Sequence, residues 1–211
     1  MLRAACLWLC WLVAGSALAG TPDADGLAVL ERARLAALRL DYRGIYFHQR
    51  GPEVGSTRIV HRREGSVAQE RLQRLDGPPN ETLRNGDELT TYLPAQRRML
   101  IERGGVQPGF PSLVALRREQ IERHYSVYRF DGDRVAGRST IAISLDPRDA
   151  YHYGYRFWLD VSTGLLLRVQ TISEKGEVVE QVAFTELKTG DIATTLLSPT
   201  SAIPVAGKSS G

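Results

Sequence analysis

The residue patterns that most often perform catalysis are missing from this sequence. It contains no G-x-S-x-G motif, no H-E-x-x-H motif, no phosphate-binding glycine loop and no dinucleotide-binding fingerprint. Hydrolase, metalloprotease and nucleotide-dependent chemistry therefore have no recognisable motif here. The sequence predicts a protein that is not an enzyme and that carries no cofactor.

The histidines are the remaining candidates for metal ligands, and they are His48, His61, His124 and His152. His48 and His61 lie in neighbouring segments that predict the two strands of one hairpin, which is the most metal-like arrangement among them. No carboxylate motif accompanies this pair, so ordinary strand histidines explain it better. The segment Asp131-Gly132-Asp133 lacks the spaced ligands and closing glutamate of a calcium loop, and a hairpin turn explains it better. We predict no metal site.

Apolar side chains on predicted strands offer a different chemistry, which is the burial of an apolar ligand. Residues 155–160 alternate between two faces, and the three consecutive leucines at 165–167 predict apolar surroundings on both faces of their strand. A filled core explains this pattern, but an antiparallel sheet of this size can also enclose an apolar cavity. Paired arginines near its rim would hold lipid phosphates. We predict a lipid-binding wall that includes Tyr46, Phe47, Phe157 and Leu167.

The elements that would position these residues follow from hydrophobic periodicity. Helical spacing occurs over 23–39, with one stripe formed by Leu27, Leu30, Arg34 and Leu38 and with Ala33 and Ala37 beside it. It occurs again over 112–124, where Ser112 would cap the helix. The rest of the sequence consists of short segments with strand-like alternation separated by turn residues. It therefore predicts an α+β chain that is mainly a curled antiparallel sheet of ten or eleven strands. These predicted strands are 41–50, 56–63, 68–75, 80–85, 88–93, 98–102, 125–130, 134–145, 151–160, 164–173 and 178–187.

The first residues predict export. A positive charge at Arg3, an uncharged run over 4–13 and the small residues Ala17-Leu18-Ala19 are typical of a signal peptide cleaved after Ala19. Cys6 and Cys10 both lie within this segment, so the mature chain would contain no cysteine, and nothing after residue 19 predicts a membrane-spanning helix. We therefore expect a soluble exported protein, located in the periplasm, that does not bind nucleic acid.

The charge and the composition of the sequence indicate the character of its surface and of its last residues. The formal net charge is +3 at pH 7, with arginine pairs that either are solvated strand and helix faces or meet acidic groups such as lipid phosphates or an acidic peptide. From residue 189 the sequence becomes rich in Ser, Pro and Gly, which predicts a linker-like tail over 189–211 that packs no core.

Several stretches of this sequence together form a recognisable pattern. They are Arg58–His61, Glu70–Leu72, Leu75–Gly77 with Glu81, Tyr92–Pro94, Arg134–Arg138, Asp146–Asp149, Tyr151–Asp160, Thr163–Arg168, and Gly176 with Glu180 and Gln181. In these residues the chain resembles the RseB/MucB family of sigma-E regulatory proteins. The resemblance extends from about residue 25 to residue 188, which is nearly all of the expected mature chain.

The resemblance implies a fold, partners and a domain organisation. The fold would be an open, unclosed β-barrel wrapped by helices, similar to LolA and LolB. The partners would be the periplasmic segment of a membrane-bound anti-sigma factor of the RseA or MucA type, and the acyl chains of lipid, lipoprotein or lipopolysaccharide, in envelope-stress signalling. Residues 1–19 would be the signal peptide, 20–188 the N-terminal-like domain and 189–211 the tail, with the smaller C-terminal domain of the family absent. A periplasmic lipid or lipoprotein carrier of the LolA type is the alternative.

Overall fold

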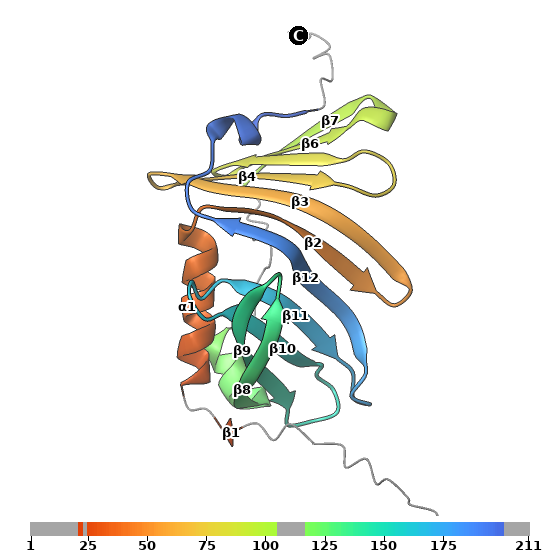
Figure 1. Cartoon of the computed structure of the whole chain (residues 1–211). Helices are drawn as coiled ribbons and strands as arrows, with labels where there is room; N and C mark the ends of the chain where they lie inside the picture. Colours follow the sequence, from red (N-terminus) through yellow and green to blue (C-terminus); the bar gives the residue numbers. More distant parts are fainter. Residues whose placement is uncertain (1–20, 23–24, 105–116, 201–211) are drawn as a thin grey trace, which may run out of the picture.

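The computed structural model describes residues 21–22, 25–104 and 117–200. Within them the chain forms one twelve-stranded antiparallel sheet and two α-helices (Figure 1). The helices are α1 (Gly26–Arg39) and α2 (Arg118–His124), with two short 3-10 helices, η1 (Pro94–Gln96) and η2 (Thr194–Leu197). The strands are β1 (Thr21–Pro22), β2 (Tyr42–Arg50), β3 (Glu53–Glu64), β4 (Val67–Arg74), β5 (Glu81–Asn85), β6 (Glu88–Leu93), β7 (Arg98–Arg103), β8 (Tyr125–Val135), β9 (Arg138–Pro147), β10 (Gly154–Asp160), β11 (Leu166–Ile172) and β12 (Val178–Thr189).

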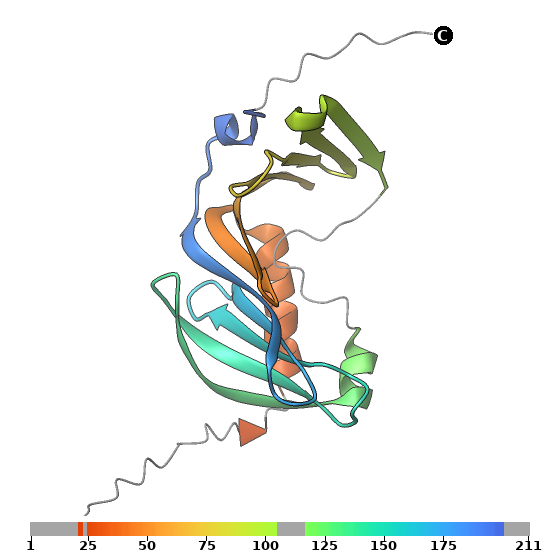
Figure 2. The ribbon, with the colours of Figure 1, turned by 90° about the vertical axis from the view of Figure 1, so that its right-hand side faces the viewer.

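The sheet is curved and open. Its order is β1-β8-β9-β10-β11-β12-β2-β3-β4-β5-β6-β7, so the pairing of β12 with β2 joins two runs of sequential neighbours, β8–β12 and β2–β7. The first and last strands of this order do not pair with each other in the described part of the chain. Figures 1 and 2 show the sheet curving around α1, which lies on its concave side. The predicted open antiparallel barrel is confirmed, and β2–β12 correspond to the eleven predicted strands.

Helix α1 packs on the sheet with part of the predicted face. Leu30 and Ala33 are buried, and Leu27 packs against the buried core, as the predicted stripe requires. Ala33 has no exposed surface, and its small side chain lets the helix lie close to the strands. The prediction was wrong for the other half of the stripe, because Arg34 is exposed and Leu38 is 44% exposed.

Two apolar clusters form the core of the described residues. The first lies between α1, α2 and the strands β8–β11, and it contains Phe157 and Ile121 of α2. The second contains Tyr42, Trp158, Leu167 and Phe184. Of the helix predicted over 112–124, residues 118–124 are helical, and the proposed cap Ser112 lies outside the described residues.

The hairpin between β8 and β9 turns at a different place from the one predicted. Strand β8 continues through Asp131-Gly132-Asp133 to Val135, with a register irregularity between Asp131 and Arg134. The chain reverses at Ala136 and Gly137 instead, where both residues have positive φ, 49° and 77°. Two successive left-handed residues suit the twist of a two-residue hairpin turn. The predicted turn at 131–133 was therefore wrong.

The segment after β12 also differs from the expected linker. Ile192 is only 4% exposed, and the carbonyl oxygen of Leu196 in η2 accepts a hydrogen bond of 2.9 Å from the guanidinium of Arg71 on β4. The backbone amide of Thr200 donates to the carboxylate of Glu81 on β5 at 3.1 Å. Residues 190–200 are thus part of the packed fold, and the linker prediction is corrected for them, while residues 201–211 lie outside the described residues.

Candidate binding site

A groove lies on the concave face of the sheet, over β2, β3 and β4. Residues that pair directly across strands point to the same side of a sheet. Phe157 pairs with Val169, Val169 with Val182, and Val182 with His48. The face that carries the first core cluster therefore continues across the sheet to β2. Tyr46 shares this face with His48. The groove has a volume of about 440 Å³. It is lined by Tyr46, His48, Arg50, Glu53, Val54, Gly55, Ser56, Thr57, Leu72, Arg74, Asn80 and Thr82.

Tyr46 is the tyrosine ring at the base of this groove, and buried aromatic rings pack behind it. The rings of Tyr46 and Phe184 meet edge to face with centroids 6.1 Å apart, and Phe184 meets Tyr42 in the same way at 6.3 Å. Burial raises the pKa of the Tyr46 phenol, so it stays neutral at physiological pH. The groove therefore combines an apolar base with the exposed cationic side chains Arg50 and Arg74.

Buried polar groups lie on the same face beside this base. Tyr42 stacks on His61 with ring centroids 4.9 Å apart, and His61 Nδ1 lies 2.9 Å from the carbonyl oxygen of Leu40. Burial lowers the pKa of His61, so the ring is neutral and Nδ1 is the donor. Burial likewise raises the pKa of Glu70, and the guanidinium of Arg84, 3.6 Å from the carboxylate, partly offsets this rise. The sequence pattern did not reveal this network, because its members come from four different strands, β2 to β5.

A second cavity of about 530 Å³ lies on the opposite, convex face. Arg43 pairs with Val60 and Val60 with Arg71, so these three side chains point to one side of the sheet, away from Tyr46. Figure 2 shows η2 and the tip of the β8–β9 hairpin on this side, away from α1. Arginine and lysine side chains outnumber the single acidic one in its lining, which favours anionic ligands. The lining residues are Arg43, Gly44, Ile45, Arg58, Val60, Arg71, Ala136, Thr185, Glu186, Leu187, Lys188 and Leu196.

The structure does not bring the predicted lipid-binding residues together. Tyr46 lines the concave groove. Phe47, its neighbour on β2, points to the opposite face, where it is half-buried between Ser56 and Ala183. Phe157 is 2% exposed in the first core cluster and Leu167 is fully buried in the second, so neither lines either cavity.

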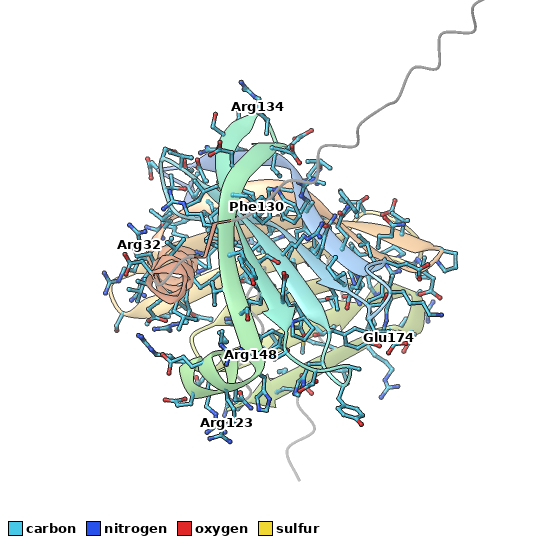
Figure 3. The ribbon with its side chains drawn as sticks, turned by 90° about the horizontal axis from the view of Figure 1, so that it is seen from below. Arg32, Arg123, Phe130, Arg134, Arg148 and Glu174 are labelled. Carbon is cyan, nitrogen blue, oxygen red and sulfur yellow. The ribbon has the colours of Figure 1, made fainter. Side chains whose placement is uncertain are left out.

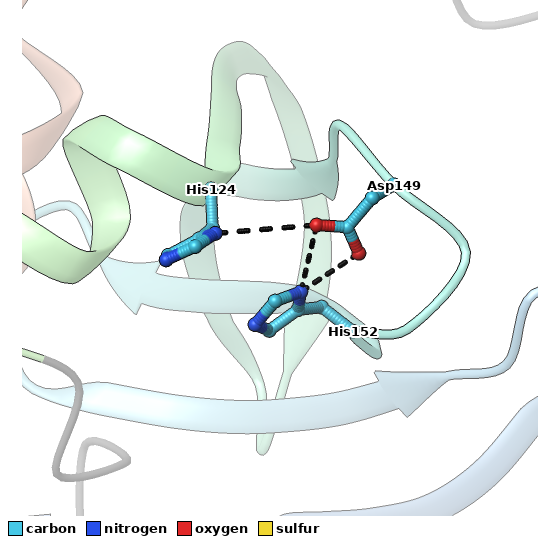
Figure 4. A group of neighbouring side chains, drawn as sticks. All are labelled: His124, Asp149 and His152. Atoms are coloured by element: carbon cyan, nitrogen blue, oxygen red, sulfur yellow. Dashed lines mark hydrogen bonds and ion pairs between the residues drawn. The ribbon is translucent and has the colours of Figure 1, made fainter.

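The hairpin histidines considered as metal ligands lie far apart along their strands. His48 is opposite Gly55, whereas His61 is opposite Tyr42 at the other end of the same hairpin. His48 Nε2 instead lies 2.6 Å from a carboxylate oxygen of Glu180. The structure brings together a different group, His124, Asp149 and His152 (Figure 4). Sequence reasoning missed it because the fold brings the end of α2 to the β9–β10 loop.

In the described residues, no helix is long and apolar enough to cross a membrane. An open curved sheet with an amphipathic groove on one face and a basic cavity on the other defines a binding protein. Residues 25–204 match the MucB/RseB N-terminal domain family, and the chain belongs to this family. The family comprises regulatory binding proteins and not enzymes, in agreement with the prediction from the motifs.

The known relatives are sigma factor regulators. The chain is 31% identical over 187 residues to the sigma factor AlgU regulatory protein MucB of Pseudomonas aeruginosa, which covers 85% of this chain and 56% of the relative. It is 28% identical over 180 residues to the sigma-E factor regulatory protein RseB of Escherichia coli K12, which covers 83% of this chain and 56% of the relative. The chain thus spans little more than half the length of these relatives.

Solved structures of MucB share the fold. The crystal structure of MucB has a TM-score of 0.69 at 27% identity, with 84% of this chain and 63% of that chain covered. The crystal structure of MucB in complex with MucA(peri) has a TM-score of 0.68 at 27% identity, with 85% and 61% covered. This chain therefore corresponds to a large part of a protein that has been seen in complex.

Proposed function

We propose that this chain is a periplasmic regulatory protein that binds the periplasmic segment of an anti-sigma factor of the RseA or MucA type and senses lipid or lipopolysaccharide. The observation that carries the proposal is the likeness to MucB in its complex with MucA(peri), which covers 85% of this chain. The signal-peptide pattern of residues 1–19 supports the periplasmic location.

The concave groove supports the lipid-sensing part of the proposal. Tyr46 and Leu72 give it an apolar wall, and Arg50 and Arg74 can pair with phosphates at its mouth. Burying each methylene group of an acyl chain contributes about 0.8 kcal/mol, so a few carbons are enough for measurable affinity. Lipid A and phospholipids combine acyl chains with phosphate, and this combination matches the groove.

Strand β7 supports the protein-binding part of the proposal. It is the last strand of the sheet order and pairs with β6 on one side. Its residues Met99, Leu100 and Ile101 are 38%, 42% and 54% exposed. An extended peptide can add to such an edge through backbone hydrogen bonds and gain affinity from the apolar side chains. We propose that the anti-sigma segment pairs with β7.

The partner proposal is tested with a fluorescently labelled periplasmic segment of the anti-sigma factor from the same genome. Fluorescence anisotropy should show saturable binding of the labelled segment, as the likeness to MucB in its complex with MucA(peri) implies. An Ile101→Lys variant should lose affinity, whereas Val161→Lys, at a comparably exposed position in the β10–β11 turn, should not. Absence of saturable binding would contradict regulation, and binding unaffected by Ile101→Lys would contradict the β7 site.

The lipid proposal is tested by displacement of a fluorescent fatty acid with lipid A. Arg74 lines the groove, shares the face of Tyr46 and has an exposed side chain, so Arg74→Asp should weaken binding without disturbing the core. Arg156, an exposed arginine of β10 that lines neither cavity, gives the matched control Arg156→Asp. Lipid binding without binding of the anti-sigma segment would favour a carrier of the LolA type. No displacement, or equal displacement in both variants, would contradict lipid sensing in the groove.

A further inference from the structure

The end of helix α2 and the loop between β9 and β10 meet at one corner of the molecule. His124 is the last residue of α2, and Asp149 and His152 belong to the loop. Pairing of Tyr125 with Pro147 brings the two segments together, and the backbone amide of Arg148 donates to the carbonyl oxygen of His124 at 2.9 Å. The backbone on both sides of the three side chains is therefore held in place.

The three side chains converge on a small volume (Figure 4). His152 Nδ1 lies 2.8 Å from Oδ1 and 3.0 Å from Oδ2 of Asp149. His124 Nδ1 lies 4.0 Å from Oδ2 of the same carboxylate. The two imidazole rings stack with centroids 4.5 Å apart. One potential ligand atom from each residue falls within 4.8 Å of the others. Each side chain is about one-third exposed, so solvent and ions can reach the group.

We propose that His124, Asp149 and His152 form a binding site for a late first-row divalent metal ion, with Zn²⁺ as the preferred probe. Two imidazoles and one carboxylate are ligands that zinc accepts, whereas calcium and magnesium require sites built mainly from oxygen. Zinc holds such ligands at about 2.0–2.2 Å, which places tetrahedral ligand atoms roughly 3.4 Å apart. The distance from His152 Nδ1 to Asp149 is 2.8 Å, shorter than this value, and the distance from His124 Nδ1 to Asp149 is 4.0 Å, longer than it. All the ligand atoms lie within 4.8 Å of one another, so side-chain rotation can reach the required spacing. Three protein ligands leave one position for water or for a group from a partner.

Other charges around the corner limit the affinity without occupying the site. Arg123 precedes His124 and Arg148 precedes Asp149, and both lie at the end of β8 opposite Arg134 at the hairpin tip (Figure 3). Their guanidinium groups repel a cation, but the exposed setting screens this repulsion. The hydrogen bond between His152 Nδ1 and Asp149 holds the ring and the carboxylate side by side before the metal arrives. The proton of this bond is released to solvent when Nδ1 binds the metal.

A metal bound here would join α2 to the β9–β10 loop by coordination bonds. Ile121 of the same helix is buried in the first core cluster, so the position of α2 and the packing of the core are linked. Because the metal binds the folded state, it should stabilise this corner.

The experiment is a titration with Zn²⁺ of the chain recovered from the periplasm of an expression host, without a polyhistidine tag. Recovery after export is preferred because Cys6 and Cys10 of the expected signal peptide would themselves bind zinc. Isothermal calorimetry should show one equivalent bound. The His124→Ala and His152→Ala variants should each weaken binding by more than about tenfold, since even changes outside the ligand set reach that size. Co²⁺ in place of Zn²⁺ should give visible absorption bands from nitrogen and oxygen ligands that both variants lose.

The matched control is His48→Ala. His48 is an exposed histidine whose side chain pairs with the carboxylate of Glu180 alone, and this pair includes no second histidine. Replacement of His48 should therefore leave zinc binding unchanged. Circular dichroism of all variants checks that they remain folded. Binding that persists in both His124→Ala and His152→Ala, binding lost with His48→Ala, or no stoichiometric binding by the unaltered chain would overturn the proposal.

Discussion

The ion pair between Arg71 and Glu81 should be essential for holding the segment after β12 on the sheet. Both side chains are nearly inaccessible, 9% and 2% exposed, and the guanidinium Nε donates to the carboxylate. The same guanidinium donates to the carbonyl oxygen of Leu196 and to the hydroxyl of Thr200, each at 2.9 Å. Replacement of Arg71 by Met would leave a buried carboxylate with Thr200 as its remaining hydrogen-bond donor among these groups.

The expected cost follows from the loss of this buried ion pair and of the other hydrogen bonds of Arg71. Removing one member of a buried pair destabilises a protein by about 3–5 kcal/mol, a large share of a typical total of roughly 5–15 kcal/mol. Glu81→Leu should cost less, because Arg71 keeps its bonds to Leu196 and Thr200. The double variant should be more stable than the sum of the single effects predicts, since it buries no lone charge.

Urea unfolding of the four proteins in this cycle measures these differences. With a slope of about 2 kcal/mol per molar urea, the Arg71→Met midpoint should fall by about 2 M. Amide hydrogen exchange should show faster exchange at Thr200, whose amide donates to Glu81. A loss below about 1 kcal/mol for Arg71→Met, or strictly additive effects in the double variant, would refute the reasoning.

Three further predictions concern the sheet itself. A Cβ at Gly44 would lie 2.2 Å from a backbone oxygen of β12, so Gly44→Ala should lower the free energy of unfolding by about 1–3 kcal/mol in urea titrations. Gly55→Ala should not, because a Cβ there would lie 4.0 Å from the nearest atom of another strand, in the side chain of Arg74. Burial lowers the pKa of His61 in the folded state, so the unfolded chain binds more protons than the folded chain as the pH falls below about 6.5. The free energy of unfolding should therefore decline below that pH. A His61→Asn variant should show a flatter dependence of its urea midpoint on pH. Arg168 lies 3.7 Å over the ring of Trp158, and Arg168→Met should cost about 1 kcal/mol, a loss that should vanish in a Trp158→Leu background if the cation–π contact is its cause.

Strand positions could be predicted because alternation and turn residues report local geometry. The hairpin between β5 and β6, with Gly86 at φ 64°, falls between the predicted strands 80–85 and 88–93. The β8–β9 turn could not be predicted in the same way, since Ala136 is not a residue that favours positive φ. Gly132, which suggested a turn, instead allows a close approach within the hairpin, where a Cβ would lie 2.2 Å from the hydroxyl of Thr140.

The candidate site was only partly predictable, because alternation tells which residues share a face but not which part of that face is open. Tyr46 and Phe157 lie on one face of the sheet, as the register from β10 through β12 to β2 shows. Helix α1 covers this face at Phe157 and leaves it open at Tyr46. The difference depends on where a helix from residues 26–39 crosses strands that are more than one hundred residues later in the chain, and no local pattern encodes that crossing.

The pairing of β12 with β2 joins the two halves of the sheet next to the groove. Phe184 lies on β12, beside a register irregularity, and its ring contacts both Tyr46 and Tyr42 on β2. A ligand that presses on Tyr46 therefore acts on Phe184, which belongs to the same core cluster as Trp158 and Leu167 of the other half. Closely packed cores transmit such displacements instead of absorbing them. Under the proposal that lipid occupies the groove, this contact would be a physical route from the ligand to the half of the sheet that carries α2.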